Sequence, residues 1–178
     1  FYFQQFMNGL PIDGYDVDAK QTLTKETINI LGNCPNPNTE EGEFSNTGSV
    51  IGYVQSGKTT SFICLTAAAL DNGYNFIIVL GGRTKALYSQ NIKEFENNFS
   101  FAVEQQKAFV FSVDLNANEN LHNISYLPLS YLEESEYFSM PLISVHLKHQ
   151  DHIKQITKAL KRRRNLLDKI NVLIIDDE

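Results

Sequence analysis

One stretch of eight residues has the residue types and the spacing needed to hold a phosphate group. Residues 52–59 read Gly-Tyr-Val-Gln-Ser-Gly-Lys-Thr and fit the pattern G-x-x-x-x-G-K-T. In this pattern the glycines let the backbone curl so that its N–H groups point at phosphate oxygens. The lysine reaches the β- and γ-phosphates, and the threonine hydroxyl coordinates Mg²⁺. The residues predicted to bind the nucleotide are Gly52, Val54, Gln55, Ser56, Gly57, Lys58, Thr59 and Thr60.

A second stretch with the same kind of chemistry lies at the other end of the chain. The apolar residues 172–175 are followed by Asp176, Asp177 and Glu178. Nucleotide hydrolysis needs one carboxylate to hold Mg²⁺ and another to orient or deprotonate the attacking water. A rigid strand end suits both tasks, because the catalysis consists mainly of positioning and charge neutralisation. The alternative is that these acidic residues only solvate the end of a strand.

Alternating apolar strands and amphipathic helices are expected to position these two stretches. The predicted strands cover residues 49–51, 74–80, 108–113, 141–146 and 172–175, and the predicted helices cover 60–70, 85–97, 150–168 and, within a loop, 131–137. This order predicts an α/β fold with a mostly parallel sheet, right-handed crossovers and helices on both faces. Ligands of such sheets bind beyond the carboxyl ends of the strands. The segments after 51, 80, 146 and 175 should therefore define the site.

The residues before the phosphate stretch form a leader with a different character. Residues 1–11 are rich in aromatic side chains and show no clear period. Asp18 is predicted to cap a helix over residues 19–31, with Gly32 just past its end. We expect this leader to pack beside the core and not to form a domain of its own.

The bulk properties describe an ordinary globular protein. The chain has 178 residues, of which 42% are hydrophobic and 20% charged, and its net charge is −6. This charge argues against a chain-wide surface for nucleic acid but leaves a local basic face open. Membrane-spanning and signal segments are not apparent, so we expect a cytoplasmic location and no membrane partner. Because the chain starts without Met and stops at an apolar strand, we also expect a fragment of a larger protein.

Taken together, these motifs resemble the first RecA-like lobe of superfamily-two helicases and translocases, the DEAD/DEAH-type ATPases. The chain looks closest to the helicase-like ATPases of bacterial restriction and defence systems, which carry a G-x-V-Q-S-G-K-T loop. Residues 79–90 are similar to the family's next motif, in which a strand ends in a turn that grips a nucleic-acid backbone, although Gly-Arg-Thr replaces the usual Pro-Thr-Arg. Residues 174–178 are similar to the D-E-x-D box, with Asp177 and Glu178 as its first two positions.

This resemblance implies a three-layer P-loop NTPase fold, truncated after the Walker B strand. Residues 1–47 would be the leader and residues 48–178 a partial RecA-like lobe. ATP and Mg²⁺ would be the cofactors, with Thr59 and Asp177 on the metal and Lys58, Asp177 and Glu178 as catalytic residues. Hydrolysis would be coupled to nucleic acid, DNA in preference to RNA, and to a nuclease domain or subunit. The second lobe would lie beyond this chain, which alone would hydrolyse little ATP.

Three residues are candidates for contact with the nucleic acid. Arg83 and Thr84 follow a strand and precede a helix, where cations and N–H groups can hold phosphates. Lys148 follows another strand at the same edge of the predicted sheet. The competing hypothesis is a nucleotide-dependent switch or scaffold that does not move along nucleic acid. A metal site at the histidines spaced by three, 146, 149 and 152, is disfavoured because no cysteine or carboxylate cage accompanies them.

Overall fold

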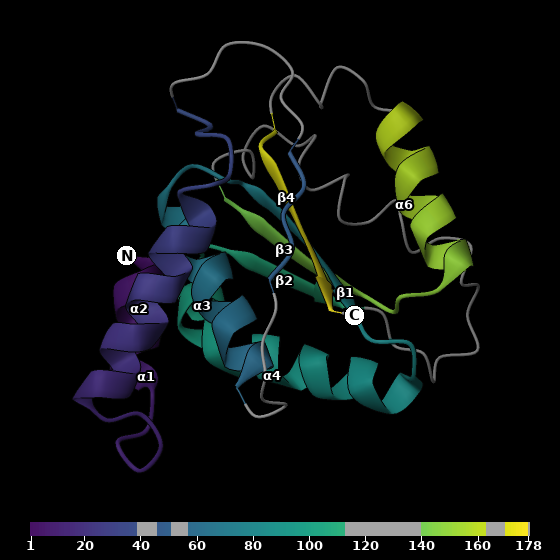
Figure 1. The fold of residues 1–178 in the computed structure, drawn as a ribbon. Helices are drawn as coiled ribbons and strands as arrows, with labels where there is room; N and C mark the ends of the chain where they lie inside the picture. Colours follow the sequence, from purple (N-terminus) through teal and green to yellow (C-terminus); the bar gives the residue numbers. More distant parts are fainter. Residues whose placement is uncertain (39–45, 51–56, 113–139, 163–169, 178) are drawn as a thin grey trace. The chain divides into compact units, whose positions relative to one another are not determined.

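The computed structural model describes residues 1–38, 46–50, 57–112, 140–162 and 170–177 (Figure 1). It divides into two compact units, Phe1–Tyr74 and Asn75–Glu178. The described part of the first unit is helical, whereas the described part of the second contains a sheet and two helices. No helix in these ranges has both the length and the apolar character needed to cross a membrane.

The first unit is built on the helix that follows the phosphate stretch. Its helices are α1 (Tyr2–Gly9), α2 (Val17–Leu31) and α3 (Lys58–Asp71). Both leader helices pack against α3. At the centre of this contact the Thr27 hydroxyl donates to Cys64 Sγ at 3.3 Å, and Cys64 Sγ lies 3.9 Å from Met7 Sδ. The leader therefore packs on α3 and shares its core.

Two helix starts differ from the prediction. The cap of α2 is Asp16, whose Oδ1 accepts from the N–H of Ala19 at 2.8 Å, so the choice of Asp18 was wrong. The helix α1 was missed altogether. Its first turn is capped by a distant side chain, because the Asp71 carboxylate accepts from the N–H groups of Tyr2 and Phe3 at 3.0 and 2.9 Å.

The second unit contains a parallel sheet, as the alternation of strands and helices predicted. Its strands are β1 (Phe76–Gly81), β2 (Phe109–Ser112), β3 (Leu142–His146) and β4 (Val172–Asp177). They lie in the order β2-β3-β1-β4, and every pairing is parallel. The helices are α4 (Lys85–Glu104) and α6 (Gln150–Arg162). This confirms the α/β class.

The two helices cover opposite faces of the sheet (Figure 1). The crossover from β1 to β2 runs in one direction along the sheet and that from β3 to β4 in the other. Right-handed crossovers in opposite directions place their helices on opposite faces. Accordingly, Ile156 and Leu160 of α6 pack on the face of β1 that carries Phe76 and Ile78. On the opposite face, a Cβ added to Gly81 would meet Asn91 of α4.

Side chains alternate along these strands, and both faces are buried in the middle of the sheet. Ile77, Ile78 and Val79 are at most 2% exposed, and Ile143 and Val145 are fully buried. A strand covered on both sides needs apolar residues at every position, which gives a continuous apolar run in the sequence. The apolar run at residues 74–80 predicts a strand buried on both faces, and this is confirmed for β1; every residue of β3 is buried as well.

Two predicted elements need correction. Ser49 and Val50 are not part of a strand, and Val50 is 60% exposed. A three-residue strand between two glycines has few side chains to bury and weak backbone restraint. The helix α4 runs to Glu104 and not to residue 97, because the fully buried Phe95, Phe99 and Ala102 continue its apolar face past the polar residues that suggested an end. The predicted helix 131–137 lies outside the described residues, as do residues 163–169 of the helix predicted to end at 168.

Candidate functional site

The helix α3 begins at Lys58, directly after a glycine with a left-handed backbone. Gly57 has a φ of +112°, a conformation that glycine adopts freely and other residues rarely adopt. Its carbonyl accepts from the N–H and the hydroxyl of Ser61, at 3.0 and 3.2 Å. The N–H groups of the first turn thus stand at the positive end of the helix dipole, where anions bind favourably. Lys58 is exposed there and Thr59 is half-buried.

A hydrogen bond joins the leader to this first turn. The hydroxyl of Tyr15, which precedes α2, donates to Oγ1 of Thr60 at 2.8 Å. This contact links the segment before α2 to the first turn of α3. The predicted binding residues Gly52, Val54, Gln55 and Ser56 lie outside the described residues.

The other predicted residues gather at the carboxyl edge of the sheet. Leu80 of β1 lies beside both His146 of β3 and Asp176 of β4 in the strand register. Just beyond, the N–H of Lys148 donates to the carbonyl of Gly82 at 2.9 Å. The turn after β1, the connection after β3 and the acidic end of β4 therefore lie together, as predicted for this unit.

The strand β4 extends through both aspartates, so their side chains point to opposite faces of the sheet. Asp176 forms an ion pair with Lys148, with 2.8 Å between Oδ1 and Nζ. Asp177 faces α4, where Nδ2 of Asn91 lies 3.5 Å from its Oδ2. The sequence-based prediction expected the strand to end before these residues. Glu178 lies outside the described residues.

The turn after β1 depends on a second left-handed glycine. Gly82 has a φ of +75°, and a Cβ added to it would lie 2.8 Å from Cβ of Leu87. Thr84 then caps α4, since its Oγ1 accepts from the N–H of Leu87 at 3.3 Å. Arg83 and Thr84 are both exposed. This geometry presents a cation beside a helix N-terminus, the combination that suits a phosphate.

We expect Gly82→Ala to lower the free energy of unfolding by about 1–3 kcal/mol, because it adds both backbone strain and a steric clash. Gly14→Ala is a matched control, since a Cβ there meets no atom within 4 Å. Urea denaturation of both variants measures the difference. Equal stability of the two variants would contradict the role given to this turn.

Two histidines near the same edge are buried, which was not predicted from the sequence. His146 and His152 are 2% and 4% exposed, and Nδ1 of each has no hydrogen-bond partner among the described residues. Nε2 of His146 lies 2.5 Å from Oγ of Ser144. Burial, with a smaller contribution from nearby His152, lowers the pKa of His146 to about 4. The pKa of His152 is lowered by burial and by nearby His149.

The available side chains do not form a multidentate metal cage in the described part of the chain. No three His, Cys, Asp or Glu residues gather there in a way that could hold a metal ion. The described part of β4 ends in two carboxylates, those of Asp176 and Asp177. Mg²⁺ is usually held by one or two carboxylates together with substrate phosphates, so such a site would need no cage.

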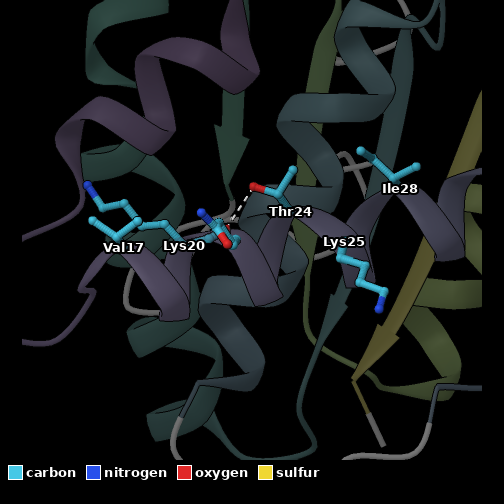
Figure 2. A pocket seen from close by; sticks show the side chains of 6 residues that line it. Val17, Lys20, Thr24, Lys25 and Ile28 are labelled. Atoms are coloured by element: carbon cyan, nitrogen blue, oxygen red, sulfur yellow. Dashed lines mark hydrogen bonds between the residues drawn. The ribbon is translucent and has the colours of Figure 1, made fainter.

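A shallow depression on the first unit is unrelated to these residues (Figure 2). It runs along α2 and is lined by Val17, Lys20, Gln21, Thr24, Lys25 and Ile28. The Thr24 hydroxyl bonds to the carbonyl of Lys20 at 2.8 Å, and the ammonium of Lys20 is held by the carbonyls of Met7 and Leu10. The polar groups of Lys20 and Thr24 thus already have partners within the unit, and the depression contains none of the predicted site residues.

Comparison with known proteins found no protein-family model, no curated protein and no solved structure that matches the chain. The resemblance to helicase-like ATPases therefore stays a prediction that rests on motifs. The function proposed next is argued from the residues and geometry described above.

Proposed function

We propose that this chain is the ATP-binding, RecA-like lobe of a nucleic-acid-dependent ATPase of the helicase or translocase type. The observation that carries the proposal is the start of α3 at Lys58, directly after Gly57 in a left-handed conformation. The G-x-x-x-x-G-K-T pattern requires a helix to begin at this position, so that its free N–H groups and the lysine meet the phosphates. Sequence and local structure agree on this point.

The residues fit ATP and Mg²⁺ chemically. Lys58 would neutralise charge on the β- and γ-phosphates, and the first-turn N–H groups would bind their oxygens. The Thr59 hydroxyl and the Asp177 carboxylate are hard oxygen ligands of the kind that Mg²⁺ prefers. When bound, the metal supplies further neutralisation of the phosphate charge. Glu178 would orient or deprotonate the attacking water.

The turn after β1 supports a contact with nucleic acid. Arg83 is exposed beside the N-terminus of α4, and Thr84 offers a hydroxyl at the same place. Such groups bind backbone phosphates without reading sequence. The resemblance extends the proposal to DNA in preference to RNA, to a cytoplasmic location and to a nuclease domain or subunit of a defence system.

ATP turnover by the full-length protein, measured with and without single- and double-stranded DNA, tests the proposal. Stimulation by either form of DNA supports a motor. Nucleotide binding with turnover that DNA does not change favours the nucleotide-dependent switch or scaffold. Failure to bind ATP at all would contradict both.

We expect Arg83→Ala to weaken DNA binding several-fold for all sequences and to reduce the dependence of log affinity on log salt by about one, as for one lost phosphate contact. Fluorescence anisotropy at several salt concentrations measures both quantities. Lys93→Ala, which removes an exposed cation elsewhere on α4, is the matched control. Identical salt dependence in the two variants would remove Arg83 from the interface.

A further inference from the structure

Lys148 makes contacts that join the ends of three strands. It follows β3, its N–H donates to the carbonyl of Gly82 after β1 at 2.9 Å, and its Nζ lies 2.8 Å from Oδ1 of Asp176 on β4. Its side chain is 19% exposed, whereas that of Asp176 is 50% exposed. Lys148 is thus held at its backbone N–H and at its ammonium group, and the ammonium group holds the partly exposed carboxylate of Asp176.

This ion pair acts at the end of β4, where the strand has a neighbour on one side. Among the described strands β4 is last in the sheet order, so its end pairs with β1 alone. Asp176 and Asp177 are the last described residues of that strand. Beside the strand pairing and the contact of Asp177 with Asn91, a charge-assisted bond to the connection after β3 adds a further restraint on the backbone that carries both carboxylates.

We propose that Lys148 is a positioning residue, which fixes the acidic end of β4 and links it to the turn at Gly82. The inference rests on the proposed ATPase function, since Asp177 on the same strand end is assigned to Mg²⁺. It also revises the role of Lys148 that the sequence suggested. If the ammonium group of Lys148 bound a nucleic-acid phosphate, the carboxylate of Asp176 would lose its partner. Lys148 is therefore poorly suited to contact nucleic acid in this arrangement.

Amide hydrogen exchange of the full-length protein tests the positioning role without reference to activity. Lys148→Met removes the charge but keeps the stem, Lys148→Arg keeps the charge, and Lys154→Met removes an exposed lysine from α6. We expect Lys148→Met to raise exchange by about tenfold both at residues 176–177 and at residues 82–84. Lys148→Arg should restore most of the protection, and Lys154→Met should match the natural protein.

Turnover shows whether the restraint matters to the reaction. We expect Lys148→Met to lower kcat by about tenfold and to raise the Mg²⁺ concentration for half-maximal turnover, because small displacements of a catalytic group are costly. Lys148→Arg should recover part of both. Asp176→Asn removes the same bond from the other side, and adding it to Lys148→Met should cause little further loss. Affinity for DNA should stay within twofold of the natural protein.

Three outcomes would overturn the proposal. Exchange at residues 176–177 equal to that of Lys154→Met would show that the ion pair restrains nothing. Turnover and Mg²⁺ dependence unchanged in Lys148→Met would show that the restraint has no bearing on the reaction. A loss of DNA affinity with a smaller salt dependence would make Lys148 a phosphate contact instead. If the natural protein turns over no ATP, the proposed function fails, and the exchange measurement still decides whether Lys148 positions the strand end.

Discussion

Lys58→Ala should lower the ATP turnover of the full-length protein at least about a hundredfold. Charge grows on the phosphate oxygens during transfer, and a fixed cation in a site with little water stabilises it far better than solvent does. Loss of a single preorganised donor of this kind typically costs ~10²–10³ in rate. Steady-state kinetics measure the loss, and Lys25→Ala, which removes an exposed lysine of α2, is the control for charge alone.

Glu178→Gln separates hydrolysis from binding in the same assay. It keeps the size of the side chain and removes the carboxylate that would act on water, so ATP binding should persist while turnover falls. Turnover unchanged in Glu178→Gln, together with turnover that does not respond to DNA, would rule out the motor. Lys58→Ala with natural turnover would rule out the nucleotide site itself.

Acidification from pH 7 to about pH 4 should cost roughly 3 kcal/mol of folding stability through His146. The pKa of this histidine is about 4 in the folded chain, against 6.5 as its ordinary value. The unfolded chain therefore takes up the proton first as the pH falls. The stabilising contribution is complete above pH 6.5 and is lost progressively down to about pH 4. The lowered pKa of His152 acts in the same direction.

Urea denaturation of the natural protein and of two variants at several pH values between 4 and 7 measures this effect. Carboxylates also titrate at the lower end, so the informative quantity is the difference in slope between proteins. His146→Gln should flatten the pH dependence between pH 6.5 and 5. Gln21→Ala, which removes an exposed side chain that carries no titrating group, should keep the natural slope. Equal slopes in all three proteins would contradict the assignment of the effect to His146.

The class of fold could be predicted from the sequence because a parallel strand that is buried on both faces consists mainly of apolar residues. The predicted strand that is now β1 is apolar at nearly every position, and the structure buries both of its faces. The predicted edge followed from the same logic, since parallel strands end on one side. Residues 81–84, Lys148 and the acidic end of β4 meet there within the second unit.

What the sequence could not show depends on which elements become neighbours. The cap on α1 comes from Asp71, about seventy residues away, and no local pattern near residue 1 reveals it. The ion pair between Lys148 and Asp176 likewise requires β3 and β4 to flank β1. The burial of His146 likewise depends on the helix that covers its face of the sheet, since Ile156 and Leu160 of α6 pack there.

Because side chains alternate along β4, the register of this strand against β1 determines the face of the sheet to which each aspartate points. Ile175 is 5% exposed, whereas its neighbour Ile174 is 59% exposed, so the buried isoleucine sets the phase of the strand. A slip of one residue against β1 would turn every side chain to the opposite face. Asp176 would then point towards α4, and Asp177 would point towards the face of α6. The burial of Ile175 in the hydrophobic core thus determines which of the two aspartate carboxylates lies on which face of the sheet.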